Sequence, residues 1–286
     1  MIYDQLINKK FHILQRNKII KDQDKFIYNE IANRINNSLE GINISVKNSL
    51  EIGFSSSNIL NYILRRFKGN NHLTVDISQE VLQNLKSEND SVCFDHDNWI
   101  IDKKFDLIIS NFYLNFSNNF NLLLKNINLS LNDNGFFLAT IPGVNCFNEL
   151  RNVMIKTDLE IYGGAYRRFN DFFPINYIAE VLKKNNFKIP VIEIDTIQLK
   201  YKKFSNLLND VRNLGSSNVF NDRKKNFENK NYFKKAEKMY WDLYSNKKEV
   251  FLLLEVIFFS GWKEHHSQQK PLNPGEAKLS LKKILE

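Results

Sequence analysis

The stretch Ser49-Leu50-Glu51-Ile52-Gly53-Phe54-Ser55-Ser56-Ser57 decides the fold of this 286-residue chain. It predicts a short strand that closes near an acidic residue, then a tight turn, then the start of a helix. In α/β proteins such a turn, at the carboxyl end of a parallel strand, holds an adenosyl ligand. Glu51 is placed to hold an amino group or the water around it, and Gly53 lets the backbone pass close to a ligand. The alternative is an ordinary strand-to-helix turn.

The turn departs from the full pattern, acidic-x-Gly-x-Gly-x-Gly, at its second and third glycines, which are Ser55 and Ser57 here. Because serine carries a Cβ, a positive φ at Ser55 would cost on the order of 1–2 kcal/mol and would reduce close approach to a ligand. The turn by itself therefore leaves cofactor binding open. Ser55 stays among the candidate cofactor-binding residues.

Polar residues also follow the next three predicted strands. Asp76 ends the second strand, where a carboxylate can accept protons from both ribose hydroxyls, and Ile77 follows it. The same logic holds for NAD, so Asp76 indicates an adenosyl ribose and does not name the cofactor, and a helix-capping Asp is the simpler alternative. Asp95 would accept a hydrogen bond from the adenine amino group. Asn111 would face the reacting end of the ligand.

Short β-rich runs alternate with amphipathic segments of helical length from residue 48 onward, which predicts a parallel sheet with helices on both faces. A helix over Phe26 to Leu39 precedes the first strand. The predicted strands are Asn48 to Ile52, His72 to Asp76, Val92 to Asp95, Phe105 to Asn111, Gly135 to Ile141, Lys188 to Lys200 and Glu249 to Ser260. The predicted helices between them are Asn58 to Phe67, Gln79 to Lys86, Asn121 to Leu131, Asn145 to Lys156 and Pro174 to Asn185.

A long excursion separates the last two strands. Its helical patterns, Phe204 to Leu214 and Phe227 to Tyr244, predict a lid or a partner-docking insert. We expect an N-terminal helical segment (1–47), a cofactor-binding core (48–201), the insert (202–248), and the last strand with a tail (249–286). Ala277 to Leu281 would form a short edge strand or a loose arm.

The net charge of +8 is concentrated near the insert, since Lys200 to Lys238 holds 11 Lys and Arg against 4 Asp and Glu. We interpret this as a solvated helix face and expect no nucleic-acid partner, although the surplus would also suit an acidic protein or an anionic membrane surface. No apolar run is long enough to cross a bilayer, and no leader is visible, so a cytoplasmic protein is expected.

Other chemistries are poorly supported. The chain lacks a nucleophile elbow and a Walker loop, and its five histidines show no metal-ligand spacing, so no metal is expected. Cys93 and Cys146 are expected to be buried, reduced thiols. No catalytic residue can be named.

The most specific motif is Gly261-Trp262-Lys263-Glu264-His265-His266-Ser267-Gln268-Gln269-Lys270-Pro271. Further motifs are Asp106 to Ser110, Leu131 to Phe137, Glu149 to Arg151 and Asp210 to Asn218. With them the chain resembles, over nearly its full length, the mitochondrial and alphaproteobacterial methyltransferase-like assembly factors of respiratory complex I, whose human member is regarded as an arginine hydroxylase. It departs from them in its glycine turn and at Asn115, where relatives have His.

This resemblance implies the class I fold of enzymes that depend on S-adenosyl-L-methionine (SAM): a Rossmann-like seven-stranded sheet with a helical insert before its last strand. It implies SAM as cofactor and a complex I subunit as the protein substrate recognised by the insert, in the bacterial cytoplasm or the mitochondrial matrix. Methyl transfer needs alignment more than acid–base groups. The alternatives are a malonyl-carrier-protein methyltransferase of biotin synthesis and a non-catalytic assembly chaperone.

Overall fold

A computed structural model of the chain describes residues 6–21, 25–85, 90–214, 218–226, 228 and 230–268. In that part of the chain the strands form one seven-stranded sheet, in the order β3-β2-β1-β4-β5-β7-β6. The strands are β1 (Asn48–Ile52), β2 (Asn71–Asp76), β3 (Asp90–Cys93), β4 (Phe105–Asn111), β5 (Leu131–Pro142), β6 (Lys188–Tyr201) and β7 (Val250–Trp262). β1 to β5 run parallel, and β7 lies antiparallel between β5 and β6.

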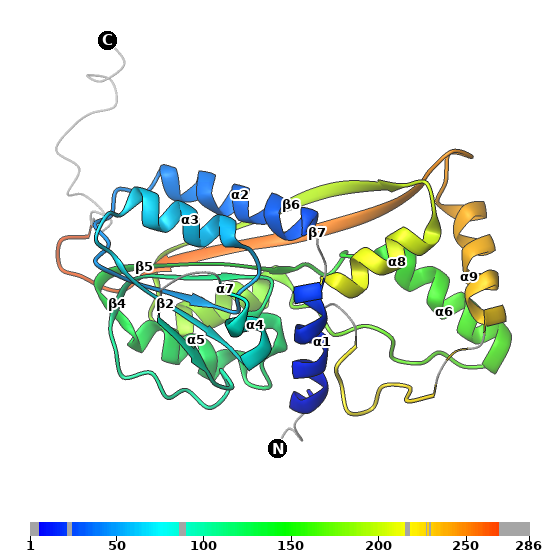
Figure 1. Cartoon of the computed structure of the whole chain (residues 1–286), viewed down its shortest axis with the longest axis horizontal. Helices are drawn as coiled ribbons and strands as arrows, with labels where there is room; N and C mark the ends of the chain where they lie inside the picture. The colour runs from blue at the N-terminus through cyan, green and yellow to red at the C-terminus, as the bar shows by residue number, and fades with distance from the viewer. Residues whose placement is uncertain are drawn as a thin grey trace, which may run out of the picture.

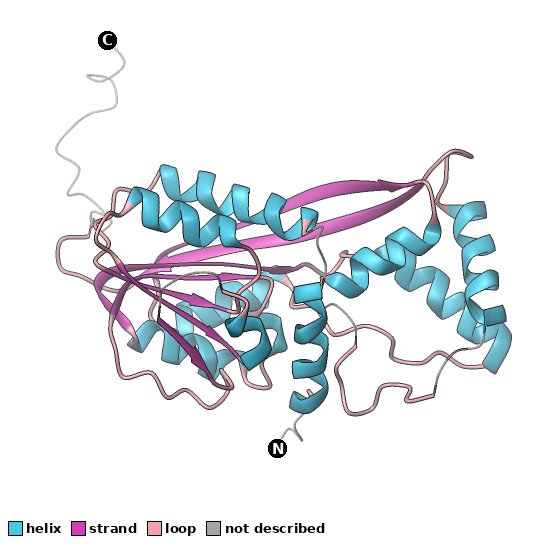
Figure 2. Cartoon of the chain, viewed as in Figure 1, coloured by secondary structure: helices cyan, strands magenta, loops and turns pink. Residues whose placement is uncertain are grey.

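Helices cover both faces of this sheet (Figures 1 and 2). The helices are α1 (Lys9–Lys21), α2 (Phe26–Glu40), α3 (Ser57–Arg66), α4 (Gln79–Gln83), α5 (Phe120–Leu129), α6 (Asn148–Tyr162), α7 (Ile175–Lys184), α8 (Phe204–Asn213) and α9 (Lys230–Leu243), with a short 3-10 turn η1 (Leu114–Phe116). α2 and α3 pack on one face and α5 and α7 on the other, each through a buried apolar side.

The strand order fixes where a ligand can bind. From β1 the chain continues outward to β2 and β3, then returns to place β4 on the other side of β1. At such a reversal the two connecting segments leave the sheet in opposite directions and a crevice forms beyond the carboxyl ends of the strands. The ends of β1 and β4 therefore mark the candidate site.

β6 and β7 extend well beyond the rest of the sheet as a long two-stranded ribbon (Figure 1). α6, α8 and α9 pack around its far end, where Tyr232, Ala236 and Tyr240 of α9 are buried. Tyr28 of α2 ties the start of this region to the sheet, because its hydroxyl donates to the carbonyl of Leu214 at 2.7 Å.

The fold class and the seven strands agree with the sequence-based prediction, and the bounds of β1 and β4 agree exactly. Several other bounds differ from the expected ones, among them those of α5, β5 and α6. The third strand ends at Cys93, so Asp95 lies in the following loop, and α4 ends at Gln83. Cys93 is exposed because β3 is an edge strand, whereas Cys146 is buried as expected. The expectation for Ala277 to Leu281 lies outside the described residues, and α1 was not predicted as an element.

Among the described residues no helix combines the length and the apolar character that spanning a bilayer requires.

Replacing Tyr28 by Phe should lower the free energy of unfolding by about 1 kcal/mol, because the buried Leu214 carbonyl loses its donor. Urea unfolding measures this. Tyr166→Phe is the control: that side chain is 42% exposed, so its loss should stay within about 0.5 kcal/mol. Equal losses in the two variants would show that Tyr28 does not anchor the region around α8.

Candidate functional site

The turn after β1 lies in the crevice and is tightly held. Gly53 has a φ of +79°, which glycine adopts without steric cost, and its N–H donates to the carbonyl of Val75 at 2.7 Å. Ser56 caps α3 by accepting from the Asn58 N–H at 3.1 Å. Ser55 has no positive φ, so the strain expected from its side chain does not arise, and Ser57 is already the first residue of α3.

The structure brings the turn and the end of β2 together. The carboxylate of Asp76 accepts from the Phe54 N–H at 3.1 Å and from the Ser78 N–H at 2.9 Å. Its side chain is completely buried. A carboxylate fixed by two backbone donors is positioned to receive a further donor from the crevice.

Glu51 lies on β1 beside this carboxylate and has no hydrogen-bond partner on either oxygen. Its nearest basic atom is Nε2 of His72, at 3.8 Å. Burial raises the pKa of Glu51. An orphaned buried carboxyl group is costly, and a cationic group placed against it would remove that cost.

The other predicted residues lie around the same edge in different roles. The N–H of Ile77 donates to the Tyr113 hydroxyl at 3.0 Å. Asn111 is buried and faces α2, where its amide donates to the carbonyl of Tyr28 at 3.3 Å. Asp95 lies at the opposite end of the crevice, in the loop after β3.

Tyr113, which the sequence analysis missed, fills the space over Gly53. Phe112 adopts a left-handed φ of 54° directly after β4, and this turn directs the Tyr113 ring onto the β1 turn. A Cβ on Gly53 would collide with that ring. The ring therefore occupies the close-approach position that Gly53 provides.

α1 was the larger omission, because it places three basic side chains along the crevice. Arg16 is buried and binds Asp76 Oδ2 at 2.5 Å and the Phe54 carbonyl at 2.5 Å. His12 stacks on Phe116, with ring centroids 4.4 Å apart. The spacing of Lys9, His12 and Arg16 on one helical face was the signal available in the sequence.

Burial and neighbouring charges set the protonation of these groups. Burial opposes the charge of Arg16, but Asp76 more than offsets it and raises the pKa of Arg16. Burial, and after it the charges of His96, Arg16 and Lys9, lowers the pKa of His12 well below its ordinary value. Burial and Lys9 lower the pKa of His96 to about 4. Near neutral pH the crevice thus holds the Arg16–Asp76 ion pair, the pairs of Lys9 with Asp95 and Asp97, and two neutral imidazoles.

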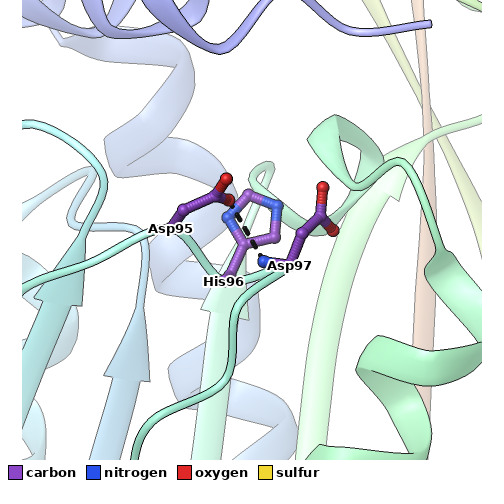
Figure 3. Close-up of side chains that lie close together, drawn as sticks. All are labelled: Asp95, His96 and Asp97. Carbon is purple, nitrogen blue, oxygen red and sulfur yellow. Dashed lines mark hydrogen bonds between the residues drawn. The ribbon is translucent and has the colours of Figure 1, made fainter. Parts of the chain in front are cut away.

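Asp95, His96 and Asp97 lie close enough to suggest a metal site (Figure 3). The Lys9 ammonium already occupies the position between the carboxylates, 2.9 Å from Asp95 Oδ1 and 2.5 Å from Asp97 Oδ2. Both ring nitrogens of His96 are also engaged, by the Tyr113 hydroxyl and the Phe116 carbonyl. The two carboxylates of the cluster are therefore neutralised by Lys9.

A family model described as a methyltransferase domain matches residues 24–190, more than half of the chain. The chain belongs to this methyltransferase domain family. Two solved structures show the same fold. A candidate methyltransferase of Bacillus halodurans has a TM-score of 0.54 and 9% identity, over 81% of this chain and 98% of that one. The YcgJ protein of Bacillus subtilis has a TM-score of 0.53 and 10% identity, over 82% of this chain and 98% of that one.

Curated relatives extend beyond the methyltransferase domain. The chain is 25% identical to the human protein named arginine-hydroxylase NDUFAF5, mitochondrial, over 98% of this chain and 82% of that protein. It is 32% identical to the Dictyostelium discoideum protein of the same name, over 65% of this chain, and it spans less than half, 43%, of that relative's length. A malonyl-[acyl-carrier protein] O-methyltransferase of Legionella pneumophila is 24% identical over 56% of this chain and 54% of that enzyme.

SAM is the cofactor of this methyltransferase family, and the residue types in the crevice suit it. The carboxylates of Asp76 and Asp95 suit the hydroxyls and amine of an adenosine, and the orphaned Glu51 suits an ammonium group. The space does not suit it in this conformation, because Arg16, His12 and Tyr113 fill the crevice and Arg16 already holds Asp76. As α1 lies here, Arg16 and Lys9 already engage carboxylates that the cofactor would need.

The contact between Gly53 and Tyr113 predicts a large effect of Gly53→Ala. Gly69 is the matched control, since its φ is +76° but nothing lies within 4 Å of an added Cβ. Both variants should lose on the order of 1 kcal/mol to backbone strain, and Gly53→Ala about 1–3 kcal/mol more from the collision. Urea unfolding measures the difference. Similar losses would mean that the ring yields without cost.

Because His12 is buried, we expect the folded state to lose stability in acid. Above its ordinary pKa of 6.5, neither the folded nor the unfolded state carries the proton. As the pH falls below 6.5 the unfolded state takes up a proton that the buried imidazole refuses, so the free energy of unfolding falls. His12→Phe keeps the stacked ring and should flatten this fall in pH-dependent unfolding, whereas the exposed His266→Phe should not. Equal acid sensitivity in both variants would contradict the assignment.

Proposed function

We propose that this chain is a SAM-binding enzyme that modifies an arginine of a protein substrate during the assembly of respiratory complex I. The observation that carries the proposal is the similarity to proteins named arginine hydroxylases, which extends over nearly the whole chain and so includes the insert and the last strand. The cofactor-binding residues proposed are Glu51, Gly53, Ser55, Asp76, Ile77, Asp95 and Asn111.

A cavity beside the crevice supports a guanidinium substrate. It has a volume of about 660 Å³ and adjoins η1, which directly follows Tyr113. Phe120, Phe173 and Tyr177 form one aromatic wall, with ring centroids of successive neighbours 4.6 and 5.4 Å apart. Arginine side chains stack on such rings.

Polar groups in the same cavity complement a guanidinium group. The Asp171 carboxylate lines it, and its present partner is Arg167 on the same chain, which shows that this carboxylate accepts a guanidinium. The Oδ1 atom of Asn115 is buried without a hydrogen-bond partner. One carboxylate, one free amide oxygen and an aromatic wall are what a planar, five-donor cation requires.

The helical insert, for which we keep the proposed bounds 202–248, would contact the protein substrate. Its basic surplus is partly neutralised, since Lys224 pairs with Glu228 at 2.7 Å and Lys235 with Glu160 at 2.6 Å. This pairing weakens the case for an insert that attracts an acidic carrier protein by charge alone. The malonyl-carrier-protein alternative also accounts for only the domain part of the chain.

A location follows from the proposed partner. Complex I is assembled in the inner mitochondrial membrane or the bacterial plasma membrane, so we propose the mitochondrial matrix or the bacterial cytoplasm, with the substrate reached at the membrane surface. The human relative is named a mitochondrial protein, which supports the mitochondrial option for a eukaryotic chain.

Asp171→Asn tests the proposal, with Asp222→Asn as its control. Both carboxylates pair with Arg167, at exposures of 67% and 61%, but only Asp171 belongs to the cavity lining. Cells carrying Asp171→Asn should show roughly tenfold less modified arginine on complex I subunits, the loss expected from one charge-assisted hydrogen bond, while Asp222→Asn should match the wild type.

Mass spectrometry of purified complex I measures this, and also tells an added methyl group from an added oxygen. If removing the chain from cells changes no arginine of a complex I subunit, the proposed function is wrong. If a methyl ester on the malonyl carrier protein disappears instead, the alternative replaces it.

A further inference from the structure

α1 occupies the cofactor crevice with a polar helical face. Lys9, His12 and Arg16 lie three and four residues apart, so they share one side of the helix. His12 and Arg16 are completely buried, whereas Lys10 and Lys18 on the same helix are exposed. Although Phe11 and Ile13 of this helix are partly buried against apolar clusters, the face formed by Lys9, His12 and Arg16 is matched to a polar receptor.

The receptor groups are those proposed for the cofactor. Arg16 binds Asp76, the proposed ribose carboxylate, and Lys9 binds Asp95, the proposed partner of the adenine amino group. His12 stacks on Phe116 between these two ends. α1 therefore occupies, through Arg16 and Lys9, two of the carboxylates proposed to bind an adenosyl ligand.

Several buried polar atoms between this helix and the crevice lack hydrogen-bond partners, which indicates that another occupant can replace the helix. Both nitrogens of His12, Nη1 of Arg16, both carboxylate oxygens of Glu51 and the hydroxyl of Ser55 are buried without hydrogen-bond partners. Buried polar groups of permanent structure are almost always paired. So many orphaned atoms in one crevice indicate a receptor shaped for a more polar occupant than α1.

We propose that α1 is a displaceable stopper of the SAM site, latched by the Arg16–Asp76 ion pair, and that SAM binds only to molecules in which α1 has left the crevice. This inference rests on the proposed function for its cofactor. The apparent affinity for SAM is then the intrinsic affinity reduced by the fraction of molecules that are open. Residues before α1 also leave with it: Leu6 and Ile7 line the proposed substrate cavity, so cofactor and substrate sites open together.

The experiment combines calorimetric titration with SAM and hydrogen exchange of the α1 amides in the full chain. Arg16→Gln removes the latch and should bind SAM about tenfold tighter than wild type, within the usual range of coupling between two states. Lys10→Gln, on the exposed face of α1, should bind SAM as wild type does. In wild type, saturating SAM should strip exchange protection from residues 9–18.

The outcomes separate the two proposals. SAM binding that leaves α1 protected in wild type overturns the stopper alone, as does weaker SAM binding by Arg16→Gln, which would make Arg16 part of the cofactor site. Failure of every variant to bind SAM overturns both the stopper and the cofactor of the proposed function. The wild-type exchange measurement decides the matter even if Arg16→Gln does not fold.

Discussion

The ion pair between Arg16 and Asp76 lies at the point where the N-terminal helix, the turn after β1 and the end of β2 meet. Both side chains are removed from water, which would cost several kcal/mol for either charge alone. Their pairing and the backbone N–H groups of Phe54 and Ser78 offset that cost. Removing the arginine would leave a buried carboxylate without a counter-charge, so the position of α1 and the order of the crevice depend on this contact.

The sheet was predictable because its strands are apolar runs closed by polar residues. β1 and β4 lie at the centre, buried on both faces, and their bounds were predicted exactly. β5 begins four residues earlier than predicted, at Leu131, and β7 ends two residues later, at Trp262, where it pairs with Phe136 of β5. β3 began and ended earlier than expected since an edge strand carries little hydrophobic signal.

Only part of the candidate site could be predicted from the sequence. Strand-end spacing placed Glu51, Gly53 and Asp76 together correctly, because neighbouring parallel strands end at one edge. The same reasoning could not find α1, whose buried side is formed by His12, Gln15 and Arg16. Hydrophobic periodicity detects helices that bury apolar residues, and it does not detect a helix whose buried side is charged or polar. Tyr113 was missed for another reason: its direction depends on the left-handed backbone at Phe112, a residue type that rarely adopts it.

The start of α1 is joined to the insert as well as to the crevice. Ile7 and Phe220 form an isolated antiparallel bridge, and the N–H groups of Asn8 and Asn221 donate to the carbonyls of Val219 and Leu6, both at 2.8 Å. A protein that pulls residues 218–221 toward itself must therefore strain the attachment of α1. By thermodynamic reciprocity, the factor by which such a protein raises the affinity of the chain for SAM equals the factor by which SAM raises the affinity of the chain for that protein. The bridge between Ile7 and Phe220 would thus couple binding of a protein at residues 218–221 to binding of SAM in the crevice.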